Sequence, residues 1–367
     1  MGYTTHDRRF ITAFVDAGYT VFFCRTAPEV RALESAALPT GVREVALELP
    51  RSHAPAGRDE AVAEALANVV RLSRPSLVHA GPVQPCGYPA ALAGGAPLSV
   101  VSWGSDLLVE ARRDATSRER ASLALSRADV VVCDCDTVRR AVHSLAEVSD
   151  ERIVQLPWGT DLDVFRPDGP HAPLRERAGW SDATIVLHTR SWEPGYGLDV
   201  VLGAFDIARR EHPSLRLVLA GDGSLARYVR AFVAAHGLAE HVLLPGRIAN
   251  AELPDLFRAA DVYVSASESD GTSVSLLEGL ATGLACVVTD IESNAEWVAE
   301  GVNGWRGRSG DSRSFADCLL RASRLDASQR DAMRARNRRV AEERADWGRN
   351  VRRLIEAYDR VARTGSR

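Results

Sequence analysis

The chain has 367 residues and a net charge of −4, with 45 basic and 49 acidic side chains dispersed along its length. This length exceeds one ordinary hydrophobic core and favours two α/β domains, and the lack of a basic tract argues against a nucleic-acid partner. No apolar run reaches membrane-spanning length and no signal peptide opens the sequence, so we expect a cytoplasmic protein without a transmembrane segment.

The first expected element is an amphipathic helix over residues 5–17, followed by a strand over 20–24. A nucleotide-binding half normally begins with a strand that feeds its first functional loop, whereas only residues 1–4 precede this helix. We therefore expect that the first strand has been lost from the sequence. A domain that is genuinely shorter is the alternative.

Strand and helix periods then alternate through the first domain. The tetrapeptide 103–106, Trp-Gly-Ser-Asp, directly follows a predicted strand. Because ligands bind beyond the carboxyl ends of parallel strands, Trp103 and Asp106 are candidates for the lining of a cleft, although Gly-Ser-Asp is also a common way to start a helix. His79 and His188 each end a predicted buried strand, where a cleft-facing position and a core position are both open. Strands are predicted over 42–49, 76–80, 98–102, 128–133 and 152–156.

Six cysteines are scattered through the chain, most of them in apolar, strand-like runs. Cys133 and Cys135 have no second pair at the spacing of a zinc site, so we expect buried, reduced thiols. Asp134 and Asp136 have the Asp-x-Asp spacing of some metal sites. Asp136 is better suited to cap a helix that starts at Thr137, and we expect the cap.

A strand over 184–189 leads directly to Arg190, and Tyr196 follows six residues later. A further strand ends at Arg247 and Ile248. The expected organisation is a first domain over 1–166, a linker with Pro and Gly turn chemistry over 167–176, a second domain over 177–345 and a last amphipathic helix over 346–367.

Residues 261–304 carry the strongest functional signal. A short buried strand, a polar loop, a helix that opens near Ser273 and a second buried strand over 285–289 form a β-loop-α-β unit. Free backbone N–H groups in the first turn of such a helix attract phosphate. Asp270 precedes the helix and Glu278 follows eight residues later. Since carboxylates repel phosphate, we expect both to bind hydroxyl groups on either side of it, and a phosphate flanked by two polyols describes a nucleotide sugar.

The pattern Asp270-x7-Glu278, followed by Gly-Leu-Ala-Thr-Gly-Leu-Ala, resembles the Glu-x7-Glu signature of the retaining family-4 glycosyltransferases of the GT-B fold. The succession of motifs between residues 184 and 304 is also similar to this family, and residues 157–165 resemble its Pro-Asn-Gly-Val-Asp-x-x-x-Phe segment. The resemblance implies two Rossmann-like, parallel-sheet domains that face one cleft. It places the donor nucleotide on the second domain and the acceptor on the first, with the C-terminal helix crossing back to the first domain.

The resemblance also implies roles for single residues. Glu278 binds the ribose hydroxyls, Asp270 binds a hydroxyl of the donor sugar, and Arg190 neutralises the diphosphate as it leaves. These three are the expected catalytic set. The other implied positions are Gly271 and Thr272 beside the sugar, Ser273 and the amides of Val274 and Ser275 at the phosphate, Arg247 and Ile248 at the base, and Trp103 and Asp106 on the acceptor side.

Two positions depart from the family pattern. Trp103 stands where family members carry a histidine, so no catalytic histidine is expected there. Tyr196 stands where the family carries a lysine that holds the diphosphate. The chain contains no lysine at all, and a coding bias of that kind predicts arginine at this position, not tyrosine. We therefore expect the diphosphate to depend heavily on Arg190, with Tyr196 donating one neutral hydrogen bond.

Retention in this family needs neither a protein nucleophile nor a metal ion, because the acceptor attacks the face that the phosphate leaves and a phosphate oxygen takes its proton. The resemblance thus implies a hexosyltransferase of glycoconjugate or natural-product biosynthesis that uses no cofactor and no metal. Its partners are a nucleotide-sugar donor and a hydroxyl acceptor. Two alternatives stay open: a GT-B sugar-nucleotide epimerase, and a non-catalytic two-domain protein that binds a sugar nucleotide. The donor base, the acceptor and the oligomeric state are also open.

Overall fold

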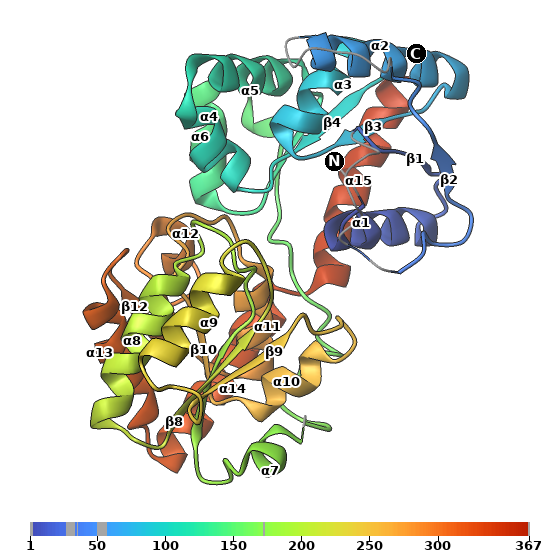
Figure 1. The fold of residues 1–367 in the computed structure, drawn as a ribbon. Helices are drawn as coiled ribbons and strands as arrows, with labels where there is room; N and C mark the ends of the chain where they lie inside the picture. Colours follow the sequence, from blue (N-terminus) through green and yellow to red (C-terminus); the bar gives the residue numbers. More distant parts are fainter. Residues whose placement is uncertain (1–2, 27–33, 35, 50–56, 172, 366–367) are drawn as a thin grey trace. The chain divides into compact units, whose positions relative to one another are not determined.

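The computed structural model describes residues 3–26, 34, 36–49, 57–171 and 173–365. The chain forms two compact units (Figure 1). Unit 1 comprises Met1–Leu156 together with Gly348–Arg367, and unit 2 comprises Pro157–Trp347. Within the described ranges, no helix has both the length and the apolar character that crossing a membrane requires.

Unit 2 is built on a parallel sheet in the strand order β12-β11-β10-β7-β8-β9. Its strands are β7 (Thr184–His188), β8 (Leu215–Ala220), β9 (Val242–Gly246), β10 (Val262–Ser265), β11 (Ala285–Thr289) and β12 (Gly304–Gly307). Its helices are α7 (Leu174–Ala178), α8 (Leu198–Glu211), α9 (Ala226–Ala235), α10 (Leu253–Ala259), α11 (Val274–Thr282), α12 (Glu292–Ala295), α13 (Ser312–Ser323) and α14 (Ala327–Arg344). The strand order reverses between β7 and β10, which is where an open α/β sheet leaves a crevice at its carboxyl edge.

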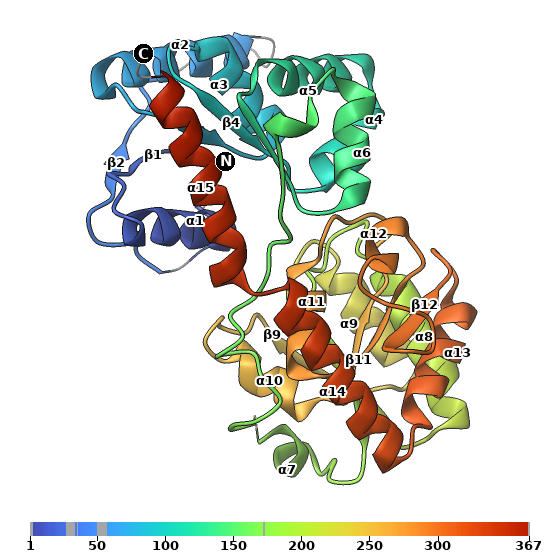
Figure 2. The same ribbon diagram turned by 180° about the vertical axis from the view of Figure 1, so that it is seen from behind.

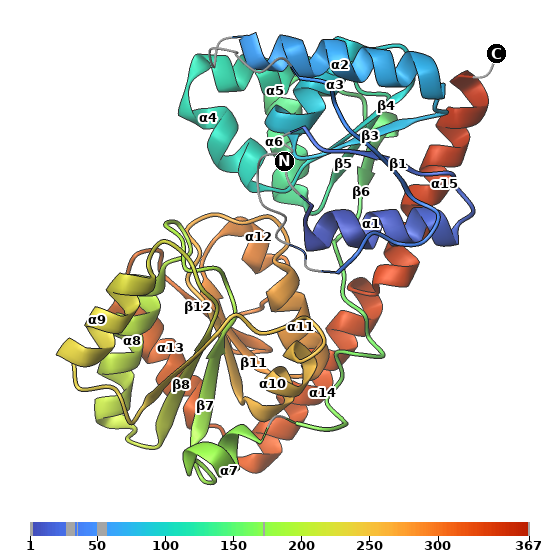
Figure 3. The ribbon, with the colours of Figure 1, turned by 45° about the vertical axis from the view of Figure 1, so that its right-hand side comes forward.

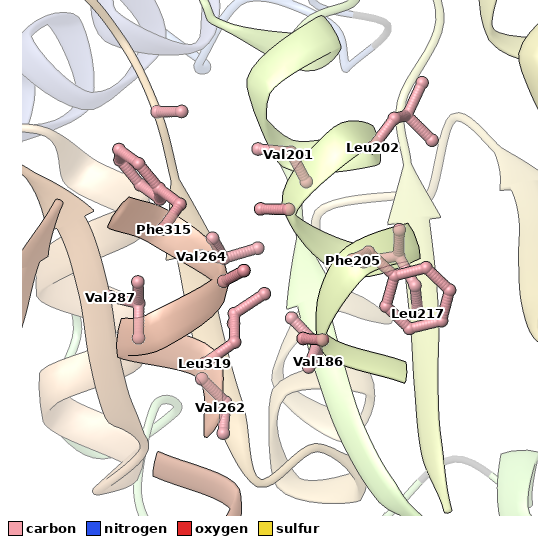
Figure 4. Close-up of a cluster of buried hydrophobic side chains, with 14 of the residues drawn as sticks. Val186, Val201, Leu202, Phe205, Leu217, Val262, Val264, Val287, Phe315 and Leu319 are labelled. Carbon is pink, nitrogen blue, oxygen red and sulfur yellow. The ribbon is translucent and has the colours of Figure 1, made fainter. Parts of the chain in front are cut away.

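Helices cover both faces of this sheet, which explains why its strands are apolar along their whole length. Figure 3 shows α8, α9 and α13 on one side and α10, α11 and α14 on the other. Successive residues of a strand point to opposite faces. Val262 and Val264 of β10 therefore pack in one core cluster with Phe205 of α8 (Figure 4), and Tyr263 between them packs in the other cluster with Leu277 of α11.

Unit 1 contains a parallel sheet in the order β3-β4-β5-β6 and a separate parallel pair, β1-β2. The strands are β1 (Phe22–Cys24), β2 (Arg43–Val45), β3 (Val78–Ala80), β4 (Leu98–Val101), β5 (Val130–Cys133) and β6 (Ile153–Gln155). The helical segments are α1 (Thr5–Asp16), α2 (Arg58–Ser73), η2 (Val83–Gly87), α3 (Tyr88–Ala93), η3 (Asp106–Glu110), α4 (Ala111–Arg113), α5 (Ala115–Arg127), α6 (Asp136–Leu145), η4 (Asp150–Arg152) and α15 (Trp347–Gly365). In the described residues no strand joins β1 to β3, and the expected loss of a first strand stays a prediction.

The C-terminal helix α15 packs within unit 1, beside α1 (Figure 2). The hydroxyl of Tyr358 lies 2.7 Å from Nδ1 of His79 and 2.7 Å from Oγ of Ser99. The ring of Tyr358 also contacts Phe14 of α1, with 5.7 Å between the ring centroids. Burial lowers the pKa of His79 to about 4. The sequence left two places for His79, one facing a cleft and one inside the domain. The structure packs it inside unit 1 among aromatic rings, where it contacts α15.

The boundary between the units lies earlier than the expected residue 166. Residues 157–166 belong to unit 2, because the N–H of Thr160 donates to the carbonyl of Ala345 at 2.7 Å. The ring of Phe165 also packs against Phe257, with centroids 5.7 Å apart. The segment that was expected to close the first domain is thus anchored on the second.

Candidate active site

The site lies at the carboxyl ends of β7 and β10, the two neighbouring strands between which the strand order of unit 2 reverses. Arg190 follows β7, and Asp270 and the start of α11 follow β10. The guanidinium of Arg190 lies 2.7 Å from a carboxylate oxygen of Asp270 and donates from its other terminal nitrogen to Oγ of Ser273 at 2.8 Å. Three predicted site residues are therefore in direct contact.

Tyr196 covers another side of Arg190. The centre of the guanidinium lies 4.6 Å from the centroid of the Tyr196 ring, a cation–π distance. The loop that carries Tyr196 is fixed against the segment after β10, since the N–H of Glu268 donates to the carbonyl of Gly195 at 3.0 Å. A side chain at Gly197 would place its Cβ 2.1 Å from the carbonyl oxygen of Ala266. This close approach requires glycine and positions the tyrosine beside Arg190.

The first turn of α11 carries the expected anion-binding groups. Ser273 is the N-cap and accepts the N–H of Leu276 at 3.4 Å, and this leaves the amides of Val274 and Ser275 at the open end of the helix. Gly271 and Thr272, which precede the cap, are buried. The helix dipole and the amides favour a negative charge at this end.

Burial and charge act against each other at the ion pair. Burial disfavours the charge on Arg190, but Asp270 first, and then Tyr263, Tyr196 and Glu278, more than offset this, so the pKa of Arg190 lies above its ordinary value. Burial raises the pKa of Asp270, while Arg190 and the N–H of Gly271 oppose that shift. Arg190 is thus a permanent cation that already has one anionic partner. Glu278, half-buried on α11, acts on the same cation.

Several buried polar atoms of unit 2 have no hydrogen-bond partner among the described residues. Buried polar groups are normally satisfied, so a cluster at the ends of β7 and β11 indicates a place for a ligand or solvent. His188 is completely buried, with Nδ1 3.1 Å from the carbonyl of Val264, and burial lowers its pKa to about 4. The atoms concerned are His188 Nε2, Thr189 Oγ1, Arg190 Nε, Trp192 Nε1 and Thr289 Oγ1.

Sequence reasoning missed Tyr263, the second residue of β10. Its side chain is completely buried, and its hydroxyl lies 2.7 Å from Oγ of Ser275. Oγ of Ser275 in turn lies 3.1 Å from Oγ of Ser273. The only signal in the sequence was a phenol in an otherwise apolar strand, because a buried tyrosine needs a partner for its hydroxyl.

The two residues expected at the base lie at the edge of this group. Arg247 is exposed, and its charge, after the hydrogen bonds from Ser224, helps to lower the pKa of Glu193. Ile248 is half-buried and packs against the core cluster that contains Leu277. Their role at the base of a nucleotide stays a prediction.

In unit 1 the carboxylate of Asp106 is surrounded by hydrogen-bond donors of the protein. Its carboxylate accepts hydrogen bonds from the hydroxyl of Ser102 at 2.6 Å and from the backbone N–H groups of Val83, Trp103 and Leu107 at 2.9 to 3.1 Å. These donors fill the lone-pair sites of a carboxylate. Asp106 therefore holds the loop between β4 and η3 in place. It also lines a cavity in unit 1, and its expected place on the acceptor side stays a prediction.

Trp103 lines a cavity of about 510 Å³ in unit 1. Its ring contacts His6 of α1, with centroids 5.2 Å apart. Arg58, Gln84 and Arg120 also line this cavity. The predicted place of Trp103 on the acceptor side thus stays a prediction.

The Asp-x-Asp pair is placed differently from its prediction. Cys135 is the N-cap of α6 and Asp136 is its first residue, where it pairs with Arg139 at 2.8 Å, so the expected cap by Asp136 is wrong. In the parts of the chain that the structure describes, no three His, Cys, Asp or Glu side chains come together as a metal site. Of the free cysteines, Cys24 and Cys86 are half-buried, and the remaining ones, at 133, 135, 286 and 318, are buried.

Known proteins resemble both units. Residues 2–164 match the family described as Glycosyltransferase Family 4, and residues 173–340 match Glycosyl transferases group 1. A D-inositol 3-phosphate glycosyltransferase of Thermobispora bispora is 31% identical over 251 residues, which cover 65% of this chain and 58% of the relative. Mannosylfructose-phosphate synthase of Agrobacterium fabrum is 27% identical over 171 residues, covering 44% of this chain and 35% of that protein. The chain spans about half the length of such curated relatives, or less.

Solved structures agree on the fold. Sucrose-phosphate synthase of Thermosynechococcus elongatus has a TM-score of 0.79 at 17% identity, with 96% of this chain and 92% of that chain covered. Anabaena HepE in complex with UDP-glucose has a TM-score of 0.71 at 19% identity, with 90% and 86% covered. The parallel-sheet architecture and the two family matches confirm the predicted fold class and family. The chain belongs to the family-4 glycosyltransferases of the GT-B fold.

Proposed function

We propose that the protein is a retaining glycosyltransferase that moves a sugar from a nucleotide-diphosphate donor to a hydroxyl acceptor, without a protein nucleophile and without a metal ion. The observation that carries this proposal is the placement of Arg190. It is a half-buried permanent cation, held by Asp270, Ser273 and Tyr196 at the open end of α11. A cation beside free helix amides suits a diphosphate leaving group.

The reaction proposed here uses these groups as follows. The acceptor hydroxyl attacks the anomeric carbon from the face that the diphosphate leaves. The bond from this carbon to the phosphate oxygen breaks, its electron pair stays on the diphosphate, and a phosphate oxygen takes the acceptor proton. Arg190 and the amides of Val274 and Ser275 stabilise the charge that develops. Glu278 binds the ribose, and Asp270 binds the sugar while it keeps Arg190 oriented.

The names of three similar proteins support a proposal for the acceptor class. D-inositol 3-phosphate glycosyltransferase, mannosylfructose-phosphate synthase and sucrose-phosphate synthase are all named for a phosphorylated polyol or sugar. We propose a phosphorylated polyol as the acceptor of this chain also. The cavity in unit 1, which Arg58, Arg120 and Trp103 line, is the candidate place for it.

The donor site is tested first by thermal unfolding with UDP, GDP and ADP. A ligand at a hundred times its dissociation constant stabilises the folded state by about 2.7 kcal/mol, and one of the three is expected to raise the melting temperature of the wild-type chain. If none does, the donor site is wrong. HepE was solved with UDP-glucose, which makes UDP the first choice.

Turnover is then tested with the matching sugar nucleotides and a panel of phosphorylated polyols. Release of nucleoside diphosphate only when donor and acceptor are both present supports a transferase. A donor that is converted to its epimer without such release supports the epimerase, and binding without any conversion supports the non-catalytic protein. The anomeric configuration of the product, read by NMR, tests retention, and unchanged rates in EDTA test the metal-free mechanism.

A further inference from the structure

A chain of hydroxyl groups lies beneath the open end of α11. Oγ of Ser273 is 3.1 Å from Oγ of Ser275, which is 2.7 Å from the hydroxyl of Tyr263. Tyr263 is completely buried at the floor of the site, whereas Ser275 is half-exposed in the first turn of the helix. Where the protons of this chain point can be worked out by counting donors.

At Ser273 the count is fixed by two N–H groups. A hydroxyl group has one proton and two lone pairs. Oγ of Ser273 accepts from Arg190 at 2.8 Å and from the backbone N–H of Leu276 at 3.4 Å. Neither N–H group can accept, so both lone pairs of Ser273 are occupied. Its own proton is left for Oγ of Ser275.

Tyr263 fills the other lone pair of Ser275. Burial raises the pKa of Tyr263 to about 12, so the phenol keeps its proton at neutral pH. The hydrogen-bond partner of the phenol is Oγ of Ser275, at 2.7 Å. Because a phenol is a stronger donor than an aliphatic hydroxyl, the phenol proton is directed to Ser275. Ser275 thus accepts from both Ser273 and Tyr263.

We propose that Tyr263 and Ser273 together turn the hydroxyl proton of Ser275 outward, so that Ser275 donates a side-chain hydrogen bond to the diphosphate of the donor substrate. Tyr263 is then a positioning residue that acts through Ser275. The inference rests on the proposed function, since it takes a nucleoside diphosphate as the occupant of the helix end. It gives the diphosphate a neutral side-chain donor, in addition to Arg190 and the amides, in a chain whose family lysine is replaced by Tyr196.

The test measures the affinities of UDP, GDP and ADP for the full chain by isothermal titration calorimetry. A hydrogen bond to a charged group contributes enough for roughly a tenfold effect or more, so Ser275→Ala is expected to weaken the nucleotide that binds by about tenfold. Ser275→Thr keeps the hydroxyl and is expected to restore most of the affinity. Tyr263→Phe is expected to weaken binding about threefold, because Ser275 loses one of the two donors that orient it.

The double variant distinguishes positioning from a structural role. In the Ser275→Ala background, Tyr263→Phe is expected to cause no further loss of affinity, because its effect passes through the missing hydroxyl. Tyr358→Phe is the matched control, since it removes a buried tyrosine hydroxyl in unit 1. It is expected to leave nucleotide affinity unchanged. Thr282→Val removes a hydroxyl at the far end of α11 and serves as the control for Ser275.

Each failure has its own meaning. If none of UDP, GDP and ADP binds the wild-type chain, the proposed function is overturned and this inference with it. If a nucleotide binds and Ser275→Ala binds it equally well, only the inference is overturned. Additive losses in the double variant overturn the positioning role of Tyr263. Circular dichroism checks that Tyr263→Phe is folded, and if it is not, the contrast between Ser275→Ala and Ser275→Thr decides.

Discussion

Asp106 of unit 1 and Asp270 of unit 2 occupy similar places in their folds, and their surroundings differ. Each follows a buried strand and lies at or before the start of a helical segment. The Asp106 carboxylate accepts from four protein groups, and the residue is buried. Asp270 has Arg190 and the N–H of Gly271 as partners, and the residue is half-buried. A carboxylate at a strand's carboxyl end is therefore available to a ligand only where the protein leaves some of its lone pairs unfilled.

A similar contrast applies to two histidines that end strands. His79 in unit 1 is half-buried, and its Nδ1 has the hydroxyl of Tyr358 from the C-terminal helix as its partner. His188 in unit 2 has a carbonyl on one nitrogen, and Nε2 has no partner among the described residues. Asp106 and His79 hold segments of unit 1 together, whereas Asp270 and His188 lie near the end of α11 where we propose that the diphosphate binds. The following predictions test this division, beginning with the largest effect.

Arg190→Ala is expected to lower kcat/KM by a factor of more than about a hundred. This factor corresponds to a loss of more than about 3 kcal/mol of transition-state stabilisation. No lysine shares the charge of the diphosphate, and the substitution also leaves Asp270 without its cation. Steady-state kinetics with the donor found by the nucleotide screen measures this. Arg308→Ala, which removes an exposed arginine of the same unit, is the control. Turnover close to wild type in Arg190→Ala would contradict the assignment of the diphosphate.

Asp106→Asn is expected to lower the free energy of unfolding by about 2–3 kcal/mol, because an amide cannot accept all the donors that converge on the carboxylate. Urea unfolding measures this, and nucleotide affinity is expected to stay unchanged. Asp270→Asn is the matched variant in unit 2. Asp270→Asn is expected to change the free energy of unfolding only slightly and to lower turnover strongly. If Asp106→Asn lost turnover at full stability, the structural role of Asp106 would be wrong.

Glu278→Gln is expected to weaken nucleotide binding by about 2 kcal/mol, within the 1.5–3 kcal/mol that a hydrogen bond to a charged group contributes. The residue is half-buried on the surface of α11, so the fold is expected to tolerate this isosteric change. Calorimetric titration measures the affinity. Glu268→Gln, at an exposed position of the preceding loop, is the control. An unchanged affinity in Glu278→Gln would contradict the prediction that Glu278 binds the ribose.

Much of the site could be predicted because it is local. Asp270, Ser273 and Glu278 lie within nine consecutive residues, and helix geometry fixes how they are spaced. The strands of unit 2 are buried on both faces, so they stand out as continuous apolar runs. The placement of Arg190 beside Asp270 follows from the adjacency of β7 and β10; the family resemblance implied roles for both residues but gave no strand order.

What could not be predicted depends on contacts between distant segments. The saturation of Asp106 requires Val83, which lies 23 positions away on another segment. The anchoring of residues 157–166 on unit 2 depends on Ala345 and Phe257. β2 is mostly exposed and short, so its alternation gave a weak signal and its predicted length was too great. No spacing rule in one segment contains such information.

The stability of unit 2 is expected to fall in mild acid through His188. Its pKa is about 4 in the folded state and about 6.5 when unfolded, so the unfolded chain takes up the proton first. The contribution of His188 to the free energy of unfolding is then fully present above about pH 6.5 and is lost as the pH falls toward 4. We expect a decrease of about 2 kcal/mol by pH 5. Urea unfolding at these pH values measures the slope. His188→Gln is expected to reduce this slope. His143→Gln, which changes an exposed histidine, is expected to leave the slope unchanged. Equal slopes in the wild type and both variants would contradict a role of His188 in the loss of stability.

The smallest expected effect belongs to Tyr196, and it separates two roles for that residue. The ring lies against the guanidinium of Arg190, and the hydroxyl is the predicted neutral donor to the diphosphate. Tyr196→Phe keeps the ring. It is expected to lower kcat/KM by an amount that corresponds to about 1 kcal/mol of transition-state stabilisation, the net contribution of one hydrogen bond. Tyr196→Leu removes the cation–π contact as well and is expected to cost up to about 1 kcal/mol more. In an Arg190→Ala background the additional loss from leucine over phenylalanine is expected to vanish, since the cation is gone. If Tyr196→Phe is silent and Tyr196→Leu is not, the tyrosine only orients Arg190, and the prediction of a hydrogen bond from its hydroxyl is wrong.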